Sequence, residues 1–148
     1  MTSGAKEPGC VLCRALEGAG GPDSLVVHVG AHDFVVMNRY PYNPGHIMIA
    51  PRRHVGTLQD ATAEELTEMM SLARRAEEAF REAYKPDGMN IGMNLGQPAG
   101  AGVADHIHLH AVPRWSGDTN FMGVVAEVRV IPEDAVAAAA RLRPYFAR

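Results

Sequence analysis

The sequence is poor in the features that mark secreted, membrane-spanning or nucleic-acid-binding proteins. Its 148 residues include only two cysteines, three positions apart, which is too few and too close for the disulfide framework of a small secreted domain. No apolar run reaches the roughly 18 residues of a membrane helix, and residues 1–9 lack an apolar signal segment. The net charge of −3 offers no broad basic surface to nucleic acid. We therefore expect a cytoplasmic protein that binds neither membranes nor nucleic acid.

The composition is sufficient for one folded domain. Hydrophobic residues make up 47% of the chain and charged residues 21%, which is ordinary for a globular protein of this length. We expect residues 1–9 to form a loose leader and residues 10–148 to form a single domain. Histidine is the unusual component, with seven residues.

The order of the predicted elements favours an α+β fold. Thr62 and Glu65 form a capping-box pattern ahead of apolar residues at helical spacing, which predicts a long helix over 63–84. Shorter helices are predicted at 10–17 and at 133–146, the latter with Pro132 at its start. Apolar segments between turn residues predict strands at 25–29, 33–38, 46–50, 89–95 and 106–112, with a further candidate at 124–130. Consecutive strands interrupted by one long helix favour an antiparallel sheet over a doubly wound parallel sheet.

The most informative motif is the alternation of three histidines with apolar residues in the strand predicted at 106–112. Because successive strand side chains point to opposite faces, His106, His108 and His110 share one face, roughly 6.5–7 Å from one to the next. The residues alone leave two functions open. The histidines could bind a metal ion, or one imidazole could be a nucleophile while its neighbours bind phosphate and move protons.

The segment before this strand favours an anionic ligand. It contains Asn90, Asn94 and the glycines at 96, 100 and 102, which offer amide and backbone N–H donors to an oxyanion or a phosphate. No cluster of acidic residues lies beside it, which argues against a catalytic metal centre. The alternative interpretation is an ordinary flexible hairpin loop.

Three sequence blocks occur in a fixed order. Residues 38–51 begin Asn-Arg-Tyr-Pro-Tyr-Asn-Pro-Gly-His, residues 106–110 carry the alternating histidines, and residues 113–121 begin Pro-Arg-Trp-Ser-Gly-Asp. Together they resemble the histidine triad superfamily of nucleotidyl hydrolases and transferases. The first block is similar to dinucleoside polyphosphate hydrolases of the fragile-histidine type, and the last to bacterial diadenosine tetraphosphate phosphorylases. The resemblance covers about residues 10–130.

This resemblance implies a fold and a set of residue roles. The fold would be a five-stranded antiparallel sheet with one long helix and a C-terminal helix, paired as a homodimer. His108 would be the nucleophile, assisted by His110 and Asn94 at the phosphate, with Asn38 at the ribose and His46 supporting the triad. The nucleotide-binding residues that it implies are Asn38, His46, Asn94, Gly100, Gly102 and His110.

The implied activity is cleavage of diadenosine polyphosphates at the α-phosphate through a covalent nucleotidyl-histidine, resolved by water or phosphate without a catalytic cofactor. The alternatives are an adenosine phosphoramidase and a non-catalytic nucleotide-binding regulatory module. The loop over 99–105 departs from the family pattern, because it lacks the hydroxyl residue that follows Gly-Gln in many relatives. Backbone N–H groups would have to replace that contact, so the preferred leaving group stays open.

The cysteine pair, Cys10 and Cys13, has the two-residue gap common in zinc sites. From spacing alone the remaining ligands are open among His28, His32, His54 and one end of the triad, and a metal-free or redox-active pair is the alternative. The resemblance extends to bacterial relatives that hold zinc, and it implies a site made of Cys10, Cys13, His54 and His106. With four protein ligands such a site would be structural.

Overall fold

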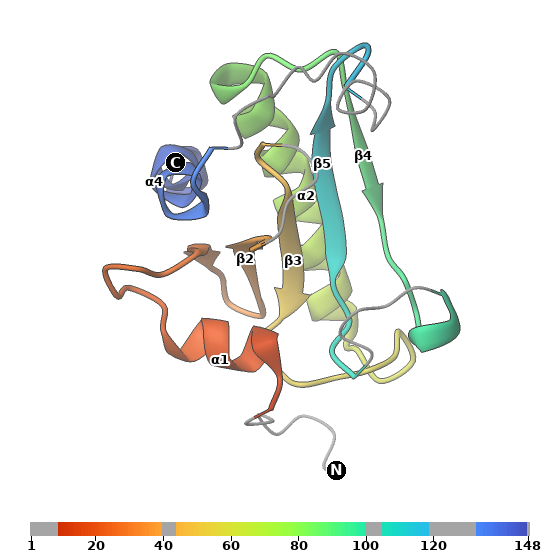
Figure 1. Ribbon diagram of the computed structural model, residues 1–148. Coiled ribbons are helices and arrows are strands. Elements are labelled where there is room, and N and C mark those ends of the chain that lie inside the picture. Colours follow the sequence, from red (N-terminus) through yellow and green to blue (C-terminus); the bar gives the residue numbers. More distant parts are fainter. Residues whose placement is uncertain (1–8, 40–43, 100–104, 119–132, 148) are drawn as a thin grey trace.

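The structure is a computed structural model that describes residues 9–39, 44–99, 105–118 and 133–147 (Figure 1). The described elements confirm the expected α+β class. The strands are β1 (Val26–Val29), β2 (Asp33–Met37), β3 (Ile47–Pro51), β4 (Gly88–Gly92) and β5 (Leu109–Arg114). The helices are α1 (Val11–Glu17), α2 (Ala63–Ala83), α4 (Ala135–Phe146) and the short 3₁₀ helix η1 (Gln97–Ala99). None of the described helices is long and apolar enough to cross a bilayer.

The five strands form one antiparallel sheet in the order β1-β2-β3-β5-β4. Strand β5 lies in the interior of the sheet, where His110 faces Met48 on β3 and Gly92 on β4. This placement brings the histidine strand next to the segment that leads into β3. The functional residues of the two segments therefore meet at the centre of the sheet.

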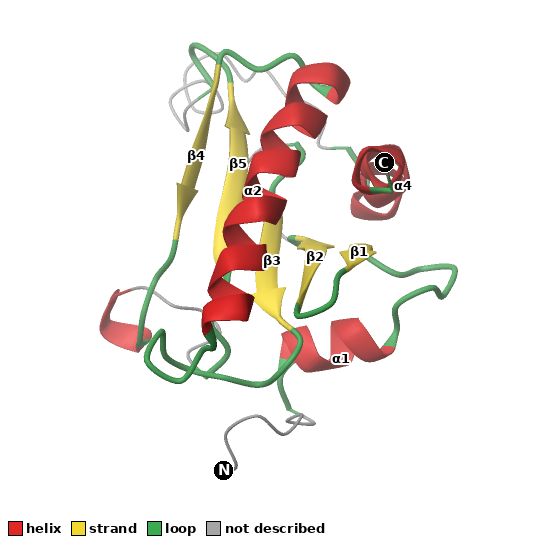
Figure 2. Cartoon of the chain, turned by 180° about the vertical axis from the view of Figure 1, so that it is seen from behind, coloured by secondary structure: helices red, strands yellow, loops and turns green. Residues whose placement is uncertain are grey.

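Helices cover the sheet on both faces. Helices α2 and α4 pack on one face, and Figure 2 shows α2 running along β3 and β5. The core on that side joins sheet residues such as Ile49 and Leu109 to Phe80 and Leu142 of the helices. A smaller core on the other side joins α1 to β1, β2 and β3 through Cys10, Leu12, Cys13, Val26, Phe34, Val36 and Ala50. Because the cysteines belong to this second core, α1 is held against the sheet beside the histidines.

Local sequence signals explain where α2 and α4 begin. Thr62 accepts a hydrogen bond from the backbone of Glu65, whose carboxylate accepts one from the Thr62 backbone, so the predicted capping box is present. Asp134 caps α4 by accepting from Ala137 N–H. Three expected features lie outside the described residues: Pro132 at the start of this helix, residues 1–8 of the leader expected over 1–9, and the candidate strand over 124–130.

Two strands, β4 and β5, differ from the sequence prediction by more than one residue at an end. Strand β5 begins at Leu109 rather than at residue 106 and continues to Arg114. The reason is that the segment before it bonds differently: Ile107 N–H donates to Val55 O, and the His106 carbonyl accepts from a side chain. Strand β4 ends at Gly92 rather than at residue 95, and η1 forms in the predicted glycine-rich loop.

A buried carboxyl group lies where the β1–β2 turn meets α2. The Glu68 carboxylate accepts hydrogen bonds from the backbone N–H groups of His32 (3.0 Å) and Asp33 (2.6 Å). The Asp33 side chain is fully buried, and neither of its oxygens has a hydrogen-bond partner among the residues described. Burial, followed by the nearby charges of Glu68 and Glu65, raises the pKa of Asp33 to about 8. The folded chain therefore keeps a proton on Asp33 at neutral pH.

We expect Asp33→Asn to stabilise the protein increasingly as the pH rises from about 4 to 8. The unfolded Asp33 ionises near pH 4 while the folded one stays protonated, so the wild type loses stability across this range and then levels off. Asparagine removes this dependence while keeping the size of the side chain. Thermal unfolding of both proteins from pH 4 to 8.5 checks this, and each kcal/mol gained should raise Tm by roughly 3 °C. An unchanging difference in Tm between pH 5 and pH 8 would contradict it.

Candidate functional site

Three imidazoles form one contiguous group where β3 and β5 pair. His46 precedes β3, and its Nε2 lies 2.9 Å from Nδ1 of His110 on β5. The His108 ring contacts the His110 ring, with 4.8 Å between the centroids and 75° between the planes. His46 and His108 are buried and His110 is half-buried, so the group is open to a ligand mainly at His110.

The protonation of His108 is set by its partner. Nδ1 of His108 lies 2.9 Å from the carbonyl oxygen of His106. A carbonyl oxygen only accepts, so Nδ1 must carry the proton and donate it. The neutral His108 ring then has its lone pair on Nε2, which is the form needed for a nucleophilic imidazole.

Asn38 follows β2 and is tied to His46 through both backbone and side chain. Its N–H donates to the His46 carbonyl at 2.9 Å. Its amide nitrogen lies 3.3 Å from Nδ1 and 3.4 Å from Nε2 of the His46 ring. The structure thus places the expected ribose contact directly beside the supporting histidine.

Burial keeps two of these rings uncharged. The pKa of His46 falls to about 4, because burial disfavours its charged form and His110 and His108 add repulsion. Burial, then His108, also lowers the pKa of His110. Both rings are therefore neutral at physiological pH, and His46 and His110 share their 2.9 Å hydrogen bond without an added charge.

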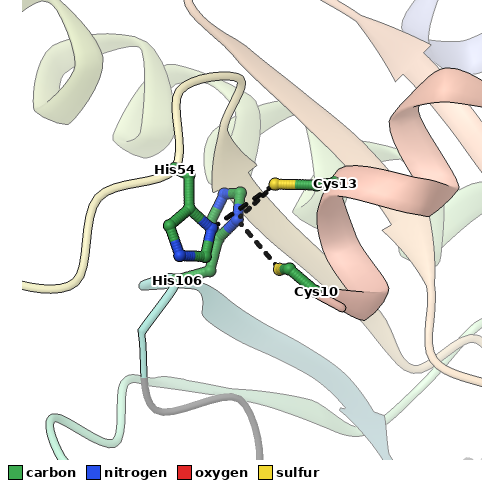
Figure 3. Close-up of side chains that lie close together, drawn as sticks. All are labelled: Cys10, Cys13, His54 and His106. Carbon is green, nitrogen blue, oxygen red and sulfur yellow. Dashed lines mark hydrogen bonds between the residues drawn. The ribbon is translucent and has the colours of Figure 1, made fainter. Parts of the chain in front are cut away.

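A second cluster gathers Cys10, Cys13, His54 and His106 beside the first (Figure 3). All four residues are buried, and one ligand atom from each lies within 4.8 Å of the others. His106 Nδ1 lies 3.4 Å from the sulfur of Cys10 and 3.6 Å from that of Cys13, and His54 Nδ1 lies 3.4 Å from Cys13. These four are the residues that the family resemblance implies.

The geometry of this cluster fits a tetrahedral ion. With ligand bonds of about 2.3 Å to sulfur and 2.0–2.1 Å to nitrogen, tetrahedral angles put sulfur and nitrogen about 3.6 Å apart. Burial lowers the pKa of His106 to about 4, so the ring is neutral and can present a lone pair. The Nε2 atom of His106 lies 2.8 Å from the Pro51 carbonyl oxygen. Because a carbonyl oxygen only accepts, Nε2 carries the proton of the neutral ring, and the lone pair on Nδ1 can bind a metal. The cluster could therefore bind a metal ion.

An ion pair next to the cluster holds the loop that carries His54. Arg53 donates to both carboxylate oxygens of Glu65, at 2.8 and 2.9 Å, and the Glu65 side chain is buried. This bidentate contact is the main cause that lowers the pKa of Glu65. The first turn of α2 thus positions the residue immediately before His54.

Of the other three expected site residues, the structure describes Asn94 but not Gly100 or Gly102. Asn94 is exposed and follows β4 by two residues, beyond the pairing of Gly92 with His110. Gly100 and Gly102 lie outside the described residues. Sequence reasoning missed the Pro51 carbonyl, the His106 carbonyl and Arg53. Carbonyl acceptors leave no signal in a sequence. The capping box did place Glu65 in the first turn of α2, but it did not indicate that Arg53 is its partner.

The chain is similar in sequence to a known family and to named proteins of that family. The HIT domain model matches residues 22–117. The chain belongs to the HIT domain family. It is 43% identical over 111 residues to a protein of Mycobacterium tuberculosis named AP-4-A phosphorylase, covering 75% of this chain and 57% of that protein. It is 35% identical over 81 residues to the bis(5'-adenosyl)-triphosphatase of Dictyostelium discoideum, covering 55% and 54%. This HIT chain thus spans little more than half the length of these relatives.

Solved structures agree with the HIT fold. A zinc-bound histidine triad family protein from Mycobacterium smegmatis matches with a TM-score of 0.73 and 28% identity, covering 94% of each chain. A hypothetical histidine triad nucleotide-binding protein from Sulfolobus tokodaii matches with a TM-score of 0.74 and 20% identity, covering 93% of this chain and 92% of that one. The expected family and its five-stranded sheet are thereby confirmed.

Proposed function

We propose that this HIT protein is a nucleotidyl hydrolase or phosphorylase that cleaves diadenosine polyphosphates at the α-phosphate. The observation that carries the proposal is the 2.9 Å contact of His108 Nδ1 with the His106 carbonyl, which makes Nδ1 the donor and places the lone pair of the neutral ring on Nε2. The His46–His110 hydrogen bond next to it supports the proposal, as do the names of the curated relatives.

In the proposed reaction, Nε2 of His108 attacks the α-phosphorus. A phosphorus–nitrogen bond forms while the bond to the leaving nucleoside polyphosphate breaks, giving a covalent nucleotidyl-histidine. His110 and Asn94 hydrogen-bond to the phosphate, and backbone N–H groups near Gly100 and Gly102 complete the oxyanion site. Asn38 contacts the ribose, and His46 orients the His110 ring that it already contacts.

A second acceptor then attacks the same phosphorus and releases His108. The 43% identity to a protein named AP-4-A phosphorylase favours inorganic phosphate over water in this step. The alternative functions are an adenosine phosphoramidase, which uses the same nucleophile with an amine leaving group, and a nucleotide-binding regulatory module without turnover.

We further propose that the cluster of Cys10, Cys13, His54 and His106 holds one structural zinc per chain. Two thiolates and two neutral imidazoles are a common zinc donor set, and four protein ligands leave no open position for chemistry. The zinc-bound neighbour from Mycobacterium smegmatis supports this choice of ion. Neither Cys10 nor Cys13 forms a disulfide, and two thiolate ligands suit a reducing compartment, so we place the protein in the cytoplasm.

The exposed edge of the sheet is the proposed contact of a homodimer. Among the described strands, β4 pairs with β5 alone, so within this part of the chain its other edge offers backbone groups for pairing. Ile91 on this strand is 46% exposed, and Met70 on α2 and Leu95 after β4 are similarly exposed. A second copy that pairs along β4 would cover these groups and extend the sheet.

We expect diadenosine tetraphosphate to yield ADP and ATP when phosphate is present, and AMP and ATP only if water serves as the acceptor. His108→Ala should lower the rate by at least about 1,000-fold, because it removes the proposed attacking lone pair. The matched control His32→Ala removes an exposed histidine and should keep wild-type kinetics. Chromatography of the nucleotides formed with and without phosphate identifies the products and gives the rate of each variant. Normal turnover by His108→Ala would refute the proposed nucleophile.

Protein purified without added metal should contain about one zinc per chain by elemental analysis. Cys13→Ser should lose most of the metal and lower the midpoint of thermal unfolding, because metal binding is coupled to folding. Ser24→Ala, which alters a hydroxyl outside the cluster, is the control for metal content. A negligible zinc content together with unchanged stability in chelator would rule out the structural site.

If β4 forms the dimer contact, Ile91→Lys should convert the dimer to a monomer, because a charge would be buried next to the new strand pair. Val29→Lys is the matched control, since Val29 is 41% exposed on the opposite edge strand β1. Sedimentation velocity measures the mass of each. A wild-type monomer at micromolar concentration, or a dimer that Ile91→Lys leaves intact, would contradict the proposal.

A further inference from the structure

One buried residue belongs to both clusters of the site. The His106 ring lies in the Cys10, Cys13 and His54 cluster, whereas its backbone carbonyl accepts the Nδ1 proton of His108. We propose that His106 is a positioning residue through which the metal-binding cluster fixes the tautomer and orientation of His108. This inference rests on the proposed function, because it assigns a role to His108 as nucleophile.

The contacts of His106 show why the cluster controls its position. Its side chain is fully buried, with Nε2–H donating to the Pro51 carbonyl at 2.8 Å. On its other side the hydrogen-bond partners of Nδ1 are sulfur atoms, at 3.4 Å from Cys10 and 3.6 Å from Cys13. Thiol groups are weak hydrogen-bond partners, so without a metal the ring is held firmly on one side alone. A metal ligand bond at Nδ1 would hold it on both sides.

The backbone around His106 determines what a loss of metal would do. Ile107 N–H donates to Val55 O at 2.8 Å, so this segment stays attached to the loop after β3 when the ring is released. We therefore expect a small shift of the His106 carbonyl rather than detachment of the strand. A neutral histidine can carry its proton on either nitrogen, and the His106 carbonyl is the acceptor that selects Nδ1 of His108. If that carbonyl shifts, Nδ1 of His108 loses its acceptor, and part of the His108 population carries its proton on Nε2 instead.

The effect on turnover should appear in kcat rather than in KM. Nucleotide binding depends on other residues, whereas attack requires Nε2 to be unprotonated and aligned. Misplacement of a reacting group by about 1 Å can cost on the order of 100-fold in rate. We expect metal-free protein to lose between about 10- and 100-fold in kcat, with KM changed by less than about threefold.

The experiment compares zinc-loaded protein, cadmium-loaded protein and the Cys10→Ala variant, each labelled with ¹⁵N-histidine. Two-bond ¹H–¹⁵N spectra report which ring nitrogen of His108 carries the proton. In zinc-loaded protein Nδ1 should be protonated and Nε2 not, and in Cys10→Ala the two forms should mix while kcat falls. Cadmium is a larger ion with longer ligand bonds, so we expect it to keep the chain folded, move His106, shift the His108 signals and lower kcat. Restoring zinc to cadmium-loaded protein should reverse both changes.

The control is Leu12→Ala, which removes a buried α1 side chain between the cysteines without removing a donor. It should lower the unfolding temperature while leaving the His108 spectrum and, below that temperature, kcat unchanged. The proposal is overturned if His108 keeps the Nδ1–H form in folded Cys10→Ala, or if its spectrum and kcat are the same with zinc and cadmium. If zinc-loaded protein turns over no nucleotide, the proposed function fails, whereas the spectra still decide the link between the cluster and His108.

Discussion

The placement of His106 is the constraint on which the rest of the site depends. This fully buried residue makes three directed contacts: one ring nitrogen to the Pro51 carbonyl, the other towards the two cysteines, and its carbonyl to His108. These contacts join α1, the end of β3 and the segment that enters β5. Because all three contacts start from one residue, moving His106 would disturb the Cys10, Cys13 and His54 cluster and the imidazole group together.

The two faces of the sheet differ: one packs against α2 and α4, and the histidines lie on the other side. Residues such as Ile49 and Leu109 face α2 and α4 in a continuous apolar core, which fixes the register of β3 and β5. The histidines lie on the opposite side, where burial keeps His46 and His110 uncharged by lowering their pKa values. The neutral state of these two rings thus follows mainly from burial on this side of the sheet.

Much of this fold could be predicted because hydrophobic periodicity and capping signals are local. The capping box at Thr62 located α2 to within a residue, and apolar segments between turn residues located all five described strands. The boundary of β5 was wrong because His106 alternates like a strand residue while its carbonyl bonds to a side chain. The four members of the metal-binding cluster required the family resemblance, since spacing alone left His28 and His32 as equal candidates. Contacts to carbonyls, such as that of Pro51, could not be predicted because every residue has one.

The central claim is that His108 forms a covalent bond to the nucleotide phosphorus. Protein mixed with diadenosine tetraphosphate and quenched within milliseconds should carry an adenylyl group, and peptide mapping at alkaline pH, where a phosphorus–nitrogen bond survives, should place it on His108. The adduct should accumulate before the first product cycle ends and disappear as substrate is exhausted. Turnover without an adduct at any quench time, or an adduct mapped to His110 or His46, would contradict the account.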